Sequence, residues 1–199
     1  VIRLRSYETV SAKDLIIGDY VHSLDGNPFP HWKKDLINEF KNQFVTTGAK
    51  IGPEHIYLVR GKQRTRNLIG EERLIIILKE LGFAILNPQQ MSLTEQINAM
   101  SGAKTVVALH GAALANILFC KENTVVFELR SKHKPPEYYS EIAKTCNLRF
   151  ESFSLPPVKR IEERHLANEQ DLLLTNSDLI QLKNKFYFIL NKCVKYEKQ

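Results

Sequence analysis

Two short segments of the sequence combine groups that could hold a phosphate. The first, His110-Gly111-Ala112-Ala113-Leu114-Ala115-Asn116, stands where a buried apolar run ends and a helix is expected to begin. The free N–H groups at a helix start, with the positive end of its dipole, bind anions. Gly111 and Ala112 would let a phosphate approach the backbone, and His110 could donate a hydrogen bond to it. The alternative interpretation is tight helix–strand packing around a buried histidine.

The second segment is the basic run Arg60-Gly61-Lys62-Gln63-Arg64-Thr65-Arg66, which follows a predicted strand and precedes Glu71. Guanidinium groups are planar, bidentate donors that suit a diphosphate. They would also stabilise the negative charge that develops on a departing diphosphate. An isolated basic run is more often a solvated loop. Because both segments follow strands, however, both are expected at one edge of the sheet, which favours a shared anion site.

A carboxylate and several absent motifs narrow the chemistry further. Glu128 lies near the end of an apolar run and could accept hydrogen bonds from ribose hydroxyls, or it could pair with Arg130 or Arg73. The sequence contains no Asp-x-Asp pair, no Walker A or Gly-x-Gly-x-x-Gly motif, no Gly-x-Ser-x-Gly motif and no zinc-type His/Cys cluster. A metal-independent diphosphate site built from Arg, His and backbone N–H groups is the simplest candidate.

Apolar strand-like runs alternate with helical patterns along most of the chain. The residue types predict strands at 15–17, 20–24, 56–59, 83–86, 105–109, 124–129 and 148–153, and helices at 30–44, 71–81, 92–102, 112–118, 135–146 and from 175 or 177 onward. Such alternation with short connections predicts an α/β fold with a doubly wound, mostly parallel, Rossmann-like sheet. Ligands of these sheets bind outside the carboxyl ends of the strands, where the strand order switches.

The last predicted helix carries apolar residues at alternating steps of three and four. A stripe of this kind favours a helix that docks on the core over a helix that pairs with a partner. The stripe consists of Leu179, Leu182, Phe186, Ile189 and Cys193. The preceding polar stretch, from Pro156-Pro157 to Asp171, is expected to be rich in loops.

The composition is that of an ordinary globular protein, with 43% hydrophobic and 25% charged residues among 199. The net charge of +6 favours a polyanion, a phosphate-bearing ligand or an anionic membrane surface. Nucleic acid is disfavoured because no nucleic-acid-binding motif is present and the basic residues do not alternate with aromatics. Three cysteines at no metal-ligand spacing indicate reduced thiols in a cytosolic protein.

No apolar run approaches the roughly 20 residues that span a bilayer, and residues 1–10 carry too many charges for a signal peptide. We therefore expect a cytoplasmic protein, with any membrane association made through parts outside this chain.

The ordered set of motifs resembles glycosyltransferase family 61 over roughly Ile56 to Leu129. The matching segments are Tyr57-Leu58-Val59-Arg60, Arg64-Thr65-Arg66, Gly70-Glu71-Glu72, Leu81-Gly82-Phe83, Leu93-Thr94-Glu95-Gln96, His110 through Phe119, and Val126-Phe127-Glu128-Leu129. The His-Gly-Ala segment that ends in Asn and Phe is the most specific of them.

The resemblance implies the nucleotide-sugar half of a GT-B-type, inverting transferase that commonly uses a UDP-sugar and needs no obligatory metal and no cofactor. By the same resemblance, Arg64, Arg66, His110 and Asn116 would lie near the diphosphate, and Glu128 near the ribose. The full set of expected substrate-binding residues is Arg60, Arg64, Arg66, Glu71, His110, Gly111, Ala112, Asn116 and Glu128.

Relatives of this family include plant cell-wall xylosyl- and arabinosyltransferases, animal O-GlcNAc transferases of the secretory pathway and bacterial capsular polysaccharide proteins. The composition, rich in Lys, Asn and Ile, leans toward the bacterial group and a role in capsular or surface polysaccharide synthesis, with a glycan as the acceptor. The alternative is a catalytically inactive module that binds nucleotides or polyanions.

The sequence departs from the family pattern at two positions. Gly70 replaces the Asn that often precedes the equivalent of Glu71, and Ala115 replaces a Thr. Both changes remove donor groups without affecting the expected fold.

A single domain is expected, with residues 1–50 linking to a missing amino-terminal half, 51–155 forming the nucleotide-sugar core, and 156–199 forming a loop and the final helix. The general base is not identified. Its candidates are His22, Asp25, His31 and His55.

Overall fold

The computed structural model describes residues 52–61, 65–132, 137–158 and 170–196, together with positions 35, 38, 39 and 42. Those four positions are helical, in agreement with the helix predicted at 30–44. The strands predicted at 15–17 and 20–24 lie outside the described residues.

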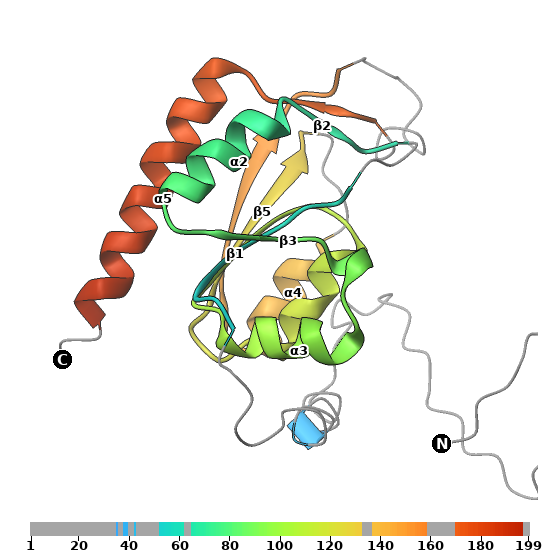
Figure 1. Cartoon of the computed structure of the whole chain (residues 1–199), viewed down its shortest axis with the longest axis vertical. Helices are drawn as coiled ribbons and strands as arrows, with labels where there is room; N and C mark the ends of the chain where they lie inside the picture. Colours follow the sequence, from blue (N-terminus) through green and yellow to red (C-terminus); the bar gives the residue numbers. More distant parts are fainter. Residues whose placement is uncertain are drawn as a thin grey trace, which may run out of the picture.

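Five parallel strands form the central sheet (Figure 1). They are β1 (His55–Leu58), β3 (Ala84–Leu86), β4 (Thr105–Leu109), β5 (Val125–Ser131) and β6 (Arg149–Leu155). Their spatial order is β3-β1-β4-β5-β6, and every neighbouring pair is parallel. The chain thus runs outward from β1 to β3, returns past β1 to β4, and continues in the other direction. This order confirms the predicted doubly wound sheet and places its switch point between β1 and β4.

Helices cover both faces of the sheet and produce two hydrophobic cores. Helices α2 (Glu71–Glu80) and α5 (Asn176–Tyr196) lie on one face, and α3 (Leu93–Gly102), the 3-10 helix η3 (Ala112–Phe119) and α4 (Tyr138–Thr145) lie on the other (Figure 1). Successive side chains of a strand pack into opposite cores, as those of Ile56 and Tyr57 do. The sequences of the buried strands are therefore continuous apolar runs. The strands and helices predicted from residue 56 onward are present, with shifts of a few residues at their ends.

Helix α5 docks on the sheet as its apolar stripe predicts. Leu179, Leu182, Phe186 and Ile189 are buried in the core that it shares with α2. The ring of Phe186 packs edge-on against Phe127, with centroids 5.1 Å apart. Reciprocal hydrogen bonds between Thr175 and Asp178 satisfy backbone N–H groups at the start of the helix.

Two features differ from the sequence-based expectation. The segment after β4 is a 3-10 helix, as the 2.9 Å hydrogen bond from the Leu114 N–H to the Gly111 carbonyl shows. The sequence predicted an α-helix there because eight residues are too few to distinguish a period of 3.0 from one of 3.6. In addition, β2 (Leu68–Ile69) and β7 (Leu172–Leu173) form a small parallel ribbon that was not predicted, since two residues carry no detectable alternation. This ribbon fixes the chain that leads from the basic run into α2.

Helix α3, which follows β3 and the short 3-10 helix η2 (Pro88–Gln90), begins with a capping box. Ser92 accepts from the Glu95 N–H at 3.3 Å, and the Glu95 carboxylate accepts from the Ser92 N–H at 2.7 Å. We expect Ser92→Ala to lower the free energy of unfolding by about 1 kcal/mol and Ser92→Gly by only a few tenths. Urea denaturation of both variants measures the difference, and equal losses would contradict the capping role.

Candidate functional site

The carboxyl ends of β1 and β4 bring Arg60 and His110 together at the switch point. Leu58 pairs with Ala108 across the two strands, so the residues that follow them lie side by side. The Arg60 Nη1 atom lies 3.5 Å from the His110 carbonyl oxygen. The same guanidinium covers Gly111, where a Cβ would approach Nη1 to 3.4 Å. The small residue at position 111 therefore leaves room for the arginine beside the start of η3.

Arg66 adds a second guanidinium to this edge. Burial lowers the pKa of Arg60 most, and the positive charge of Arg66 lowers this pKa further, so Arg66 acts electrostatically on the same edge. The Arg66 Nε atom is buried and has no hydrogen-bond partner among the described residues. Two like charges and an unsatisfied donor at one place are costly unless an anion binds there. Arg64, the third arginine of the predicted site, lies outside the described residues.

The backbone around Arg66 is fixed by a distant part of the chain. Arg66 has a φ of 62° in the left-handed region. The next residue, Asn67, donates from both its backbone N–H and its side-chain amide to Asp171 Oδ1, at 2.7 and 3.0 Å. Asp171, just before β7, therefore holds the backbone next to Arg66 in place. Sequence reasoning missed this role because 104 residues separate the two partners.

A buried carboxylate orients the histidine of the site. The Nδ1 atom of His110 lies 2.5 Å from Glu128 Oε1, and Glu128 is 2% exposed. Since a carboxylate only accepts, Nδ1 is the donor, and this bond fixes the direction in which the ring presents Nε2. The ring also packs edge-on against Tyr139, with centroids 5.1 Å apart.

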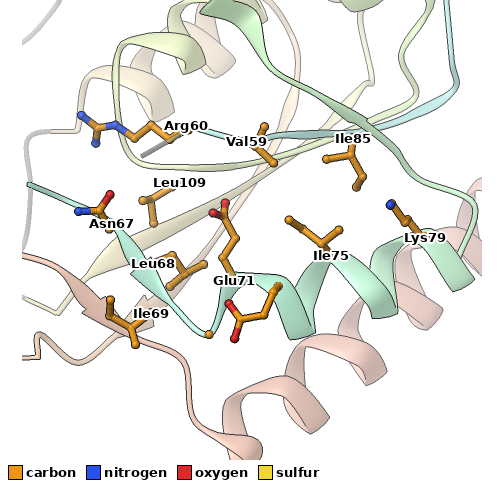
Figure 2. A pocket seen from close by; sticks show the side chains of 13 residues that line it. Val59, Arg60, Asn67, Leu68, Ile69, Glu71, Ile75, Lys79, Ile85 and Leu109 are labelled. Carbon is orange, nitrogen blue, oxygen red and sulfur yellow. The ribbon is translucent and has the colours of Figure 1, made fainter. Parts of the chain in front are cut away.

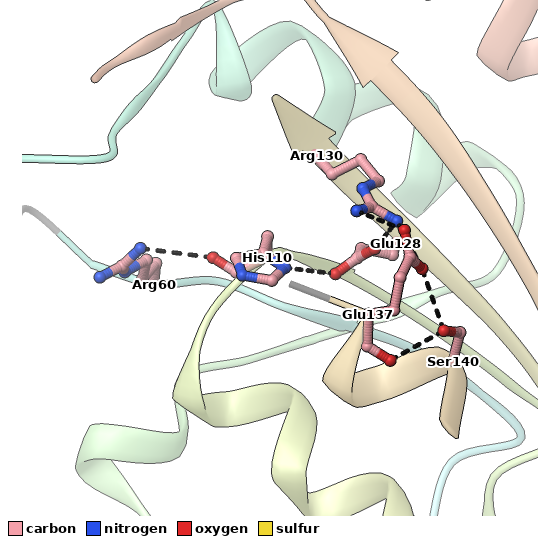
Figure 3. Close-up of polar contacts among 6 residues, drawn as sticks. All are labelled: Arg60, His110, Glu128, Arg130, Glu137 and Ser140. Carbon is pink, nitrogen blue, oxygen red and sulfur yellow. Dashed lines mark hydrogen bonds and ion pairs between the residues drawn. The ribbon is translucent and has the colours of Figure 1, made fainter. Parts of the chain in front are cut away.

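The other oxygen of Glu128 continues the polar network (Figure 3). Arg130 lies 3.4 Å from Glu128 Oε2 and makes two bonds to Glu137, at 3.1 and 3.2 Å. Of the two arginine partners that the sequence left open for Glu128, Arg130 is therefore the one observed, and the expected ribose contact stays a prediction. Arg73 instead donates to Asn176 and to the Leu174 carbonyl.

Tyr139 was not predicted as part of the site. Burial first, and then the charge of Glu128, raise the pKa of Tyr139, whereas the nearby Arg66 and Arg60 charges lower it. The hydroxyl thus lies within the field of both arginines and of the buried carboxylate. No local sequence signal marks this residue, because α4 brings it to His110 only when the sheet is assembled.

A cleft of about 850 Å³ adjoins Arg60 on the α2 face of the sheet (Figure 2). Apolar side chains of Val59, Ile75 and Ile85 contribute much of its wall. Glu71 extends into it from the first turn of α2, and the fully buried Tyr57 donates its hydroxyl to Glu71 Oε1 at 2.6 Å. Burial and the Glu71 charge raise the pKa of Tyr57 well above its usual value, so the hydroxyl remains a donor.

Not all predicted residues converge on this place. Asn116 donates to Gln96 at 2.8 Å, between η3 and α3, so its expected contact with the diphosphate stays a prediction. Ala112 is exposed next to Gly111 at the start of η3. His55 begins β1 and thus lies at the opposite edge of the sheet, which argues against it as the general base. The other three base candidates, His22, Asp25 and His31, lie outside the described residues.

Metal ligands, membrane-spanning helices and cysteines are considered for the described residues 52–61, 65–132, 137–158 and 170–196. Residues in these ranges contain no group of three or more His, Cys, Asp or Glu side chains placed to hold a metal ion. None of their helices is both long and apolar enough to cross a bilayer. Cys120 and Cys146 are buried free thiols, as expected from the sequence.

Comparison with known proteins gives two matches. The family model described as Glycosyltransferase 61 matches residues 3–127, which is more than half of the chain. The chain is also similar to Protein O-linked-mannose beta-1,4-N-acetylglucosaminyltransferase 2 of Takifugu rubripes, with 24% identity over 160 residues. That alignment covers 74% of this chain and 27% of the relative, so the chain spans little more than a quarter of the relative's length.

Proposed function

Because the chain belongs to the glycosyltransferase 61 family, we propose that its switch-point site binds a nucleoside-diphosphate sugar for transfer to an acceptor hydroxyl. The observation that carries the proposal is the Arg60 guanidinium beside Gly111, within reach of the Arg66 charge, together with a buried Arg66 Nε that has no partner among the described residues. A diphosphate supplies the charge and the acceptor oxygens that this arrangement needs. The start of η3 adds backbone N–H groups on the same side.

The proposed reaction is a single in-line displacement with inversion at the anomeric carbon. The acceptor oxygen forms a bond to that carbon while the bond from the carbon to the diphosphate oxygen breaks. The acceptor proton passes to a base that we do not assign to a described residue. Arg60 and Arg66 stabilise the negative charge that builds up on the departing nucleoside diphosphate. Since these cations can perform that task, we propose transfer without an obligatory metal.

We favour a UDP-sugar as the donor and a surface glycan as the acceptor, as the resemblance and the composition of the sequence imply. The chain spans about 27% of the length of its curated relative, and we propose that an additional half of the protein holds the acceptor. The competing function is an inactive module that binds nucleotides or polyanions. Turnover by a protein that carries the additional half would exclude it.

Calorimetric titration with UDP, GDP, CDP and ADP tests the donor site, with magnesium and again with EDTA. We expect one diphosphate to bind selectively, with an affinity that the chelator leaves unchanged. Heparin and inorganic polyphosphate serve as polyanion controls. Binding that is equal for all four nucleotides, rises with polymer length and falls steeply with salt would instead support the polyanion-binding module.

A further inference from the structure

The cleft between α2 and the sheet differs in chemistry from the arginine pair that it adjoins. Arg60 stands at the boundary, since it lines the cleft and also contacts the His110 carbonyl. On one side lie the two guanidinium groups and the start of η3. On the other side lie an apolar wall and the Glu71 carboxylate (Figure 2). A ligand that occupies both parts must be anionic at one end and carry hydroxyl donors on a weakly polar body at the other.

Glu71 is held in a fixed position within the cleft. The hydroxyl of Tyr57, a residue of strand β1, donates to Glu71 Oε1, and Tyr57 has no exposed surface. Oε2 has no hydrogen-bond partner among the described residues, and Glu71 is half-buried. A carboxylate with one oxygen anchored and the other open is suited to accept hydrogen bonds from the vicinal hydroxyls of a ribose.

We propose that this cleft is the nucleoside subsite of the donor, with Glu71 accepting from the ribose hydroxyls and the apolar wall of Val59, Ile75 and Ile85 contacting the ring system. The proposal rests on the proposed function, because it requires a nucleoside diphosphate. It moves the ribose contact from Glu128, which the sequence suggested, to Glu71. Both oxygens of the buried Glu128 already face His110 and Arg130.

The charges at the two ends also set the direction of the ligand. Glu71 and Glu72 line the cleft together with Lys79, so beyond Arg60 the charge of the cleft is net negative and repels a diphosphate. The two arginines attract the diphosphate, so a nucleotide binds with its ribose in the cleft and its phosphates at the switch point. The cleft volume of about 850 Å³ lies within the range of small-molecule sites. Ile75 and Glu71 lie four residues apart on α2, so they share one face of the helix and present the apolar and polar contacts together.

The test uses Glu71→Gln, a substitution of equal size at a half-buried position. The ligands are the tightest-binding of the four ribonucleoside diphosphates, its 2′-deoxy counterpart and inorganic pyrophosphate, the last measured by displacement. We expect Glu71→Gln to lower ribonucleotide affinity about 10- to 100-fold, as loss of a charge-assisted hydrogen bond does. The preference of the wild type for ribo- over deoxynucleotide should disappear. Pyrophosphate affinity should stay unchanged or rise slightly, because a nearby negative charge is removed.

Glu80→Gln is the matched control, because it removes one carboxylate from the exposed end of the same helix. It should bind all three ligands as the wild type does. If Glu71→Gln keeps the wild-type ribonucleotide affinity, or keeps the preference for ribose, the nucleoside subsite is wrong while the donor site stands. If the wild type binds no nucleoside diphosphate, the proposed function itself fails.

Discussion

Arg66→Ala is expected to weaken nucleoside-diphosphate binding by about 100-fold or more, and at the same time to stabilise the ligand-free protein. The loss of affinity follows because a guanidinium makes charge-assisted bonds to phosphate, each of about 1.5–3 kcal/mol. The gain in stability follows because Arg66 buries an unpartnered Nε and repels Arg60 when no anion is bound. An unsatisfied buried donor costs about 1–3 kcal/mol, so we expect the free energy of unfolding to rise by about 1 kcal/mol.

The two effects are measured on one variant, by calorimetric titration and by urea denaturation without nucleotide. Lys104→Ala is the control for charge, because Lys104 pairs with Glu54 at 2.9 Å near the start of β4, at the other edge of the sheet. It should change neither affinity nor stability by more than a few tenths of a kcal/mol. If Arg66→Ala destabilised the protein and left affinity unchanged, Arg66 would be a structural residue and the arginine pair would not be the diphosphate site.

Opposite effects on binding and stability distinguish a binding residue from a structural one. Arg73, seven residues further along, is a contrasting case, because its guanidinium already donates to Asn176 and to the Leu174 carbonyl. It joins α2 to the start of α5, so its removal would cost stability without any gain. The sequence alone does not tell these two roles apart. The partners of Arg73 lie about 100 residues away in the sequence, and Arg66 Nε has no partner among the described residues.

The sheet was predictable from the sequence because each of its strands has a local residue pattern that is typical of a buried strand. Residues 105–109 are apolar and largely β-branched, and β4 has these bounds. The capping box at Ser92 and the apolar stripe of α5 are equally local signals. Alternation of strands and helices then implied a parallel sheet, and parallel strands place the residues that follow them at one edge. That reasoning brought Arg60, His110 and Gly111 together correctly.

The partners of the side chains were not predictable in the same way. The pairing of Glu128 with both His110 and Arg130 depends on how neighbouring strands and the start of η3 assemble. Asn116 donates to Gln96 across η3 and α3, a contact between two elements that no single segment of the sequence contains. The cleft beside Glu71 lies between α2 and strands from separate parts of the chain, so no segment contains it.

Glu128→Gln is expected to be the most destabilising single substitution in the site, by about 3 kcal/mol. The buried carboxylate is shared between His110 and Arg130, and the amide cannot accept from both while it also presents two N–H groups to them. Removing one member of a buried charge pair leaves the other partly uncompensated. For a chain of this size, the loss corresponds to a fall in Tm of roughly 6–12 °C, measured by differential scanning calorimetry.

A second substitution separates stability from the orientation of His110. Glu128→Gln combined with Arg130→Met removes both charges, so we expect the double variant to recover at least half of the lost stability. Glu137 loses Arg130 but keeps the hydrogen bond from Ser140 and is exposed, which makes that loss small. Nucleoside-diphosphate affinity, measured below the Tm of each variant, should stay reduced in the double variant, because a neutral amide accepts a weaker hydrogen bond from His110 than a carboxylate does. Arg130→Met alone keeps the bond from Glu128 to His110 and should keep the affinity. If affinity instead followed stability across the three variants, Glu128 would act on the site only by holding the fold together.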